Sequence, residues 1–148
     1  VDSMDSDADV VVVFGGTNDF GHGDAKLGTF ESRDPYTFYG AMHVLCEKLI
    51  NRFPNADILF MTPLHRCSED EVSKENGLPE ETNLAGYVSI IREVAEFYGL
   101  PVLDLFSTSG LQPKVDIIKE TYMPDGLHPS DAGALRIALR LMGFLQTL

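Results

Sequence analysis

Three short apolar runs separate longer stretches of mixed polarity and predict three strands. The runs are residues 9–16, which contain four consecutive valines and end in two glycines, residues 57–63, which end in a proline, and residues 102–106. An unbroken apolar run is typical of a strand that helices cover on both faces, as in a parallel sheet. The first run is too apolar for an open sheet edge, so we expect another strand to pair with it.

Apolar residues at helical spacing predict three helices. We expect helices over about 35–52, with Asp34 as N-cap, from Asn83 to about Tyr98, and from the N-cap Ser130 to Leu148. Residues 20–34 and 64–81 are polar and charged, and are predicted as long loops. Strands that alternate with helices, joined by right-handed crossovers, predict an α/β fold with a parallel sheet, in a single domain over residues 1–148.

Composition and charge narrow the classes of partner. Apolar residues make up 44% of the 148 residues and charged residues 23%, which is typical of globular proteins and excludes collagen and disorder. No apolar run approaches the ~18 residues of a membrane span. The net charge of −12 repels nucleic acids and anionic lipid surfaces, so we expect a small neutral or cationic substrate and no nucleic acid partner. The two cysteines form no disulfide framework, and the compartment stays open between cytoplasm and secretion, with the cytoplasm slightly favoured.

Asn18 is the first candidate for chemistry, because ligands of open α/β sheets bind beyond the carboxyl ends of the strands. It follows the first predicted strand and the glycines Gly15 and Gly16, which let the backbone approach a ligand closely. A side-chain amide at this place is a candidate donor to an oxyanion. Taken alone, the segment 16–19 is more often a simple turn, in which asparagine tolerates a left-handed conformation.

Asp125 and His128 form a second candidate group just before the last predicted helix. They are three residues apart, close enough for the carboxylate to accept a hydrogen bond from one ring nitrogen. Such a bond fixes the tautomer and leaves the other nitrogen to act as a general base. Taken alone, this pattern is more often a helix-capping loop that happens to contain a histidine.

The two groups together resemble a known pair of motifs. Gly16-Thr17-Asn18-Asp19 after a buried strand and Asp125-Gly126-Leu127-His128-Pro129 before the last helix resemble the G-x-N-D and D-x-x-H-P motifs of the SGNH, or GDSL-type, hydrolases. The resemblance covers essentially the whole chain. It implies a flavodoxin-like three-layer fold, of which this chain supplies about three strands with their helices. It also implies a serine esterase, lipase or acylhydrolase activity on a small acyl ester, with no metal and no organic cofactor.

The resemblance also implies roles for single residues. His128 resembles the general base, Asp125 the acid that orients it, and Asn18 and Gly16 the oxyanion hole. The family's nucleophile, in a Gly-Asp-Ser segment after an earlier strand, is absent from this chain. Four of its serines lie next to predicted strands and offer no substitute. Ser3 and Ser6 precede the first strand, and Ser107 and Ser109 lack a nucleophile-elbow pattern after the third.

The missing nucleophile leads to an expectation about the whole protein. We expect this chain to be the carboxyl-terminal part of its domain, with a missing N-terminal segment or another chain that completes the sheet and supplies the serine. Two alternatives stay open. One is a flavodoxin-like binding module without catalysis, and the other is a metal-dependent phosphoester hydrolase that uses Asp19 and Asp125.

Several polar residues are expected near the rim of the substrate cleft. They are Asp19, His22, His65 and Arg66. A metal site of His22 and Asp24 is not predicted, because the two lack a partner cluster of ligands. His43 is expected to be packed or on the surface of its helix. Residues 69–81 could form a lid, although a solvated charged loop is commoner.

Overall fold

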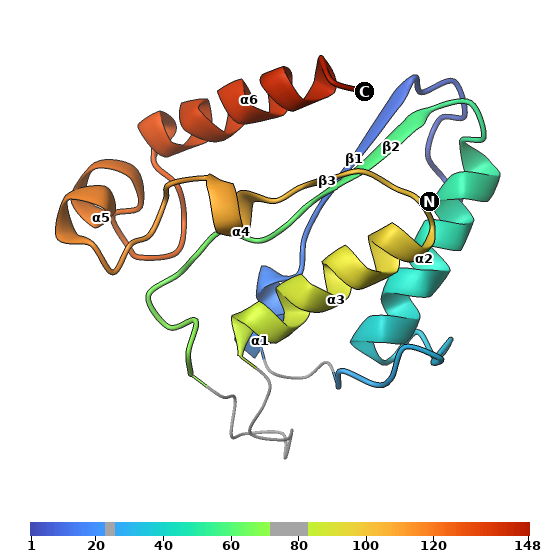
Figure 1. The fold of residues 1–148 in the computed structure, drawn as a ribbon, viewed down its shortest axis with the longest axis horizontal. Coiled ribbons are helices and arrows are strands. Elements are labelled where there is room, and N and C mark those ends of the chain that lie inside the picture. Colours follow the sequence, from blue (N-terminus) through green and yellow to red (C-terminus); the bar gives the residue numbers. More distant parts are fainter. Residues whose placement is uncertain (23–25, 72–82) are drawn as a thin grey trace.

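Three parallel strands form the sheet, with helices on both of its faces (Figure 1). A computed structural model describes residues 1–22, 26–71 and 83–148. The strands are β1 (Val10–Phe14), β2 (Asp57–Met61) and β3 (Val102–Leu103), in the order β1-β2-β3. In the register, Val12 pairs with Leu59 and Met61 with Leu103. The predicted α/β fold with a parallel sheet is confirmed.

The sheet separates two apolar core clusters, and helices cover each of them. The described helices are α1 (Thr17–His22), α2 (Phe38–Arg52), α3 (Leu84–Phe97), α4 (Leu105–Thr108), α5 (Asp116–Tyr122) and α6 (Asp131–Leu145). One core cluster joins α2 and α3 to strand residues such as Val11 and Phe60. The other joins α6 to Leu59 and Met61 on the opposite face. Among the helices of the described residues, none is both long and apolar enough to cross a membrane.

The predicted helix starts are right at two places and wrong at a third. Asn83 and Ser130 cap α3 and α6 as expected, each with a side-chain oxygen that accepts a backbone N–H of the first turn. Helix α2 begins at Phe38, with Thr37 as its N-cap instead of Asp34. Asp34 instead accepts the N–H of Tyr36 at 3.0 Å, and this local turn competes with an earlier helix start.

The predicted third strand and the predicted loops also need correction. The strand stops at Leu103, because Asp104 accepts the N–H of Ser107 at 3.2 Å and caps the short helix α4. Helix α1 lies partly in the predicted loop 20–34, and the sequence analysis missed α5. Asp24 and residues 72–81 of the predicted acidic loop lie outside the described residues.

Strand β1 lies at the edge of the described sheet and is covered on one face only. Val11 is buried toward α2 and α3, but Val10, Val12 and Phe14 on the other face are 44%, 40% and 50% exposed. The expected burial on both faces is therefore wrong within the described residues. Three apolar residues of α6 are exposed as well, namely Leu135, Leu139 and Met142. We call these six residues of β1 and α6 the apolar strip.

Candidate active site

A cavity of about 200 Å³ lies beyond the carboxyl ends of β1 and β2. Three segments that are distant in the sequence line it, and they contribute Phe14, Gly15, Thr17, Asn18, Pro63, Leu64, Leu127, His128 and Pro129. The carboxyl ends of parallel strands meet at one edge, which is why loops so far apart in the sequence converge here. The cavity brings Asn18 and His128 together.

Asp125 makes three hydrogen bonds within its turn, two of them with His128. Its Oδ2 lies 2.7 Å from the ring Nδ1, and its Oδ1 accepts the backbone N–H groups of Leu127 at 2.8 Å and His128 at 2.7 Å. The bond with the His128 ring and the two backbone bonds lower the pKa of Asp125, so the carboxyl is ionised at neutral pH. An Nδ1–H that donates to this carboxylate leaves Nε2 with a free lone pair, as a general base requires.

The turn that carries this pair is fixed at both ends. Gly126 has a φ of 78°, a left-handed conformation that glycine adopts without strain, and its N–H donates to Met123 O at 2.8 Å. A Cβ at Gly126 would lie 2.6 Å from the Sγ of Cys67, so only glycine fits at this position. After the turn, Ser130 caps α6 and its N–H donates to Tyr122 O at 2.8 Å.

Asn18 is placed by a tight turn between β1 and α1. Gly16 has a φ of 101°, and a Cβ there would lie 3.1 Å from the side chain of Ile91. This close approach sends the chain straight from β1 into α1, so that Asn18 reaches the cavity. Gly16 itself, with Asp19, lines a second cavity of about 190 Å³ on the α2 side of β1.

The remaining predicted rim residues lie outside the lining of the cavity that contains Asn18 and His128. His22 is exposed at the end of α1. His65 packs against Phe106, with ring centroids 3.9 Å apart, and Arg66 donates from Nη1 to Thr17 O at 3.3 Å. His43 is expected to be either packed or on the surface of its helix, and in the structure it is fully buried. Its Nδ1 lies 3.0 Å from the Tyr98 hydroxyl.

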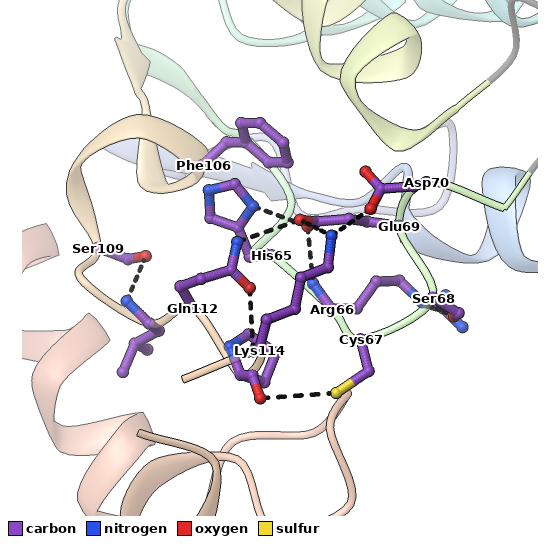
Figure 2. Close-up of polar contacts among 12 residues, drawn as sticks. His65, Arg66, Cys67, Ser68, Glu69, Asp70, Phe106, Ser109, Gln112 and Lys114 are labelled. Carbon is purple, nitrogen blue, oxygen red and sulfur yellow. Dashed lines mark hydrogen bonds and ion pairs between the residues drawn. The ribbon is translucent and has the colours of Figure 1, made fainter. Parts of the chain in front are cut away.

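Glu69 is a buried carboxylate that the sequence analysis did not single out. It is 7% exposed and lies at the centre of the contacts in Figure 2. Its partners are His65 Nδ1 at 2.7 Å, the Arg66 N–H at 3.1 Å, Gln112 Nε2 at 3.1 Å and Lys114 Nζ at 2.9 Å. Burial alone would raise its pKa, but these bonds, first of all that from Lys114, outweigh burial and lower it to about 2.

The segment around Glu69 also touches the turn of Asp125 and His128. The N–H of Cys67 donates to Gly126 O at 2.9 Å, and the Cys67 thiol lies 3.7 Å from Pro113 O. The sequence offered one signal, the spacing of His65 and Glu69 by four residues, but nothing in it set Glu69 apart from the other acidic residues nearby. Within the described ranges, no three side chains of His, Cys, Asp or Glu are grouped as a metal ion would need.

Comparison with known proteins identifies the relatives of this arrangement. Residues 2–136 match the model of the GDSL-like Lipase/Acylhydrolase family. No curated protein matches the chain.

Solved structures share the fold over nearly the whole chain. One crystal structure has a TM-score of 0.87 and 39% identity, over 99% of this chain and 68% of that chain. A protein from Lactobacillus plantarum also has a TM-score of 0.87, with 32% identity over 99% of this chain and 70% of that chain. An acetyl xylan esterase has a TM-score of 0.54 and 23% identity over 91% of this chain and 66% of its own, which shows the fold alone.

Proposed function

This chain belongs to the GDSL-like lipase/acylhydrolase family, and we propose that the protein hydrolyses carboxylic esters of small acyl groups with a serine nucleophile. The observation that carries the proposal is the Asp125–His128 pair, 2.7 Å apart, in which the ring borders the same cavity as Asn18. A base held in one tautomer beside an amide donor is the arrangement that acyl transfer needs.

In the proposed mechanism, the serine attacks the ester carbonyl and Nε2 of His128 takes its proton. Asp125 stabilises the imidazolium that forms, and the side-chain amide of Asn18 donates a hydrogen bond to the oxyanion. Gly16, which lines the other cavity, sets the turn that carries Asn18. His128 then gives the proton to the leaving alcohol. Water, activated by the same imidazole, releases the acid from the serine. The chemistry requires no metal and no organic cofactor.

The nucleophile is proposed to come from a segment that this chain does not contain. The two most similar structures described above are longer, since this chain spans 68% and 70% of their lengths. The open edge of β1 and the apolar strip offer a place for a further strand. A strand parallel to β1 would end at the cavity edge, where its last residues reach His128. Another chain that adds such a strand would serve equally.

The proposed substrates carry short acyl groups. Five apolar side chains dominate the cavity wall, namely Phe14, Pro63, Leu64, Leu127 and Pro129. A volume of about 200 Å³ suits a group of a few carbons better than a long chain. The acetyl xylan esterase among the structures of the same fold makes acetylated sugars the first esters to test.

The experiment uses the protein from its complete gene, with p-nitrophenyl acetate and acetylated xylose as substrates. Labelling by a serine-directed fluorophosphonate should identify one serine, in a Gly-Asp-Ser segment. His128→Ala should lower kcat by several orders of magnitude, and Asn18→Ala by about 10²–10³. The control is Asn51→Ala, which should be fully active, because Asn51 is an exposed asparagine of α2 whose side chain donates to Glu47 O one turn earlier in the same helix.

Three results would refute the proposal. Full activity in His128→Ala would show that His128 is not the general base. A complete protein without a fluorophosphonate-reactive serine would favour the binding module without catalysis. Activity that a chelator abolishes and fluorophosphonate leaves intact would favour a metal-dependent hydrolase instead.

A further inference from the structure

We propose that Arg66 is a positioning residue, which sets the place of Asn18 by holding the backbone and the Phe20 ring of α1. The inference rests on the proposed function, because the residue that Arg66 positions is the proposed oxyanion donor. Within the part of the chain that the structure describes, Arg66 lines neither of the two cavities given above, so in this proposal it acts through the helix and not on the substrate.

Helix α1 depends on outside contacts for its position. It has only six residues, far fewer than the 12–15 at which an isolated helix becomes marginally stable in water. Its one buried side chain, Phe20, packs edge-on against Tyr87 of α3, with ring centroids 6.0 Å apart. A single aromatic anchor leaves the helix free to rotate, so a second contact is needed to orient Asn18.

Arg66 provides this second contact at three positions of α1. Its Nη1 donates to Thr17 O at 3.3 Å, and its guanidinium lies 5.4 Å from the centre of the Phe20 ring. A Cβ at Gly21 would lie 2.7 Å from Nη1, so the guanidinium rests directly on the helix backbone there. Positions i, i+3 and i+4 lie on one side of a helix, so the three contacts act together, and Asn18 directly follows the first of these positions at the cavity.

Arg66 is itself held by the segment 65–69, which is shown in Figure 2. Its backbone N–H donates to the Glu69 carboxylate at 3.1 Å, and its Nε donates to Ser68 Oγ at 3.2 Å. The next residue, Cys67, donates its N–H to Gly126 O. One rigid segment therefore contacts both α1 and the turn of Asp125 and His128, and fixes the distance between donor and base.

A double-mutant cycle on the complete protein tests the proposal. Arg66→Met should lower kcat by about 10- to 100-fold with KM within about twofold, since a misplaced donor affects the transition state more than substrate binding. In the Asn18→Ala background the same substitution should cost nothing further, because Arg66 acts through Asn18. Arg66→Lys should recover part of the activity, since one ammonium reaches one acceptor but cannot bridge Thr17 and Ser68.

The matched control is Arg92→Met. Its guanidinium, like that of Arg66, bonds a serine hydroxyl, Ser107 at 2.9 Å, and it also bonds the Asp104 carboxylate at 2.7 Å. Both partners lie outside α1, and Arg92 is not among the residues that line the cavity of Asn18 and His128. It should leave kcat unchanged. An equal loss of kcat from Arg66→Met with and without Asn18 would overturn the proposal, and so would a rise in KM with kcat intact.

A readout without catalysis separates this inference from the proposed function. In Arg66→Met, or in Arg66→Lys if the first variant does not fold, the backbone amide NMR signals of residues 17–19 should shift. Unchanged signals would refute the positioning role of Arg66 even if the esterase mechanism holds. If the signals shift while Asn18→Ala keeps full activity, the oxyanion role of Asn18 fails and Arg66 still orients α1.

Discussion

At the scale of single residues, Glu69 shows how a buried charge can be stable. Taking a carboxylate out of water costs several kcal/mol unless its oxygens are bonded. Here both oxygens have partners, and Lys114 supplies a full positive charge at 2.9 Å. The same bonds join the segment 65–69 to the residues before α5.

This carboxylate predicts a dependence of stability on pH. The Glu69 pKa is about 2 in the fold and has the ordinary value of 4.5 in the unfolded chain, so the unfolded chain binds a proton first as pH falls. The contribution of Glu69 is complete above about pH 4.5 and is lost as pH falls toward 2, by up to about 3 kcal/mol. Urea denaturation between pH 2.5 and pH 7 should show a shallower decline for Glu69→Gln than for the unsubstituted protein.

The control for this experiment is Glu120→Gln, at an exposed position of α5. Its stability should follow that of the unsubstituted protein at every pH. Identical slopes for Glu69→Gln and the unsubstituted protein would show that the hydrogen bonds of Glu69 do not contribute to folding.

The sequence indicated which residues could meet at the site, but not which ones hold them in place. Asn18 and His128 follow predicted elements, and the topology of a parallel sheet brings them to one edge. His65 and Arg66 likewise follow a predicted strand, β2, but their side chains do not line the cavity. Arg66 points toward α1 and His65 toward Glu69. The direction of the Arg66 side chain depends on Thr17, a partner 49 residues away that spacing does not indicate. By contrast, the His65 contact with Glu69 is local.

At the scale of the elements, helix starts decide where the site residues lie. Helix α6 begins directly after the turn of Asp125 and His128, and Ser130 ends the turn with two bonds. Its Oγ accepts the N–H of Gly133 at 3.3 Å and donates to Thr121 O at 2.9 Å. The cap therefore ties the start of α6 to the end of α5.

Removal of this cap should lower the stability. Ser130→Ala is expected to cost about 1 kcal/mol, the usual loss for an N-cap, measured as the free energy of unfolding in urea. Ser89→Ala on α3 is a matched control, because Ser89 is exposed and its hydroxyl only donates back to Ala85 O in the preceding turn. It should change stability by less than about 0.5 kcal/mol. Equal effects of the two substitutions would argue against the capping role.

Long periodic elements could be predicted from the sequence, and short ones could not. Helix α3 combines a regular apolar stripe with an N-cap and a stop signal, so its bounds were predicted closely. Helices α1, α4 and α5 have four to seven residues, too few for a period to show. The apolar residues around Asp104 predict a strand, but its carboxylate caps α4 in the structure.

At the scale of the whole molecule, the apolar strip predicts how residues 1–148 behave in isolation. Exposed β-branched and aromatic residues beside an open strand edge favour pairing with other chains. Residues 1–148 alone should self-associate, as seen by light scattering, while the protein from the complete gene should not. A cooperative, monomeric and high-temperature melt of the isolated residues would contradict this expectation.

Single substitutions can assign the self-association to the strip. Val12→Thr keeps a β-branched side chain at a strip position 40% exposed and should reduce scattering. Tyr36→Thr removes a larger apolar side chain, 87% exposed and outside the strip, and should leave the scattering unchanged. The sequence suggested a partner for β1 from its valines, but only the structure shows that the uncovered face is the one toward α6.

The course of the chain after β2 has a consequence for redesign of the acyl pocket. Pro63 and Leu64 form part of the cavity wall and run without a break into the segment 65–69. Substitutions that enlarge the pocket at these two positions would alter acyl-chain selectivity and turnover together.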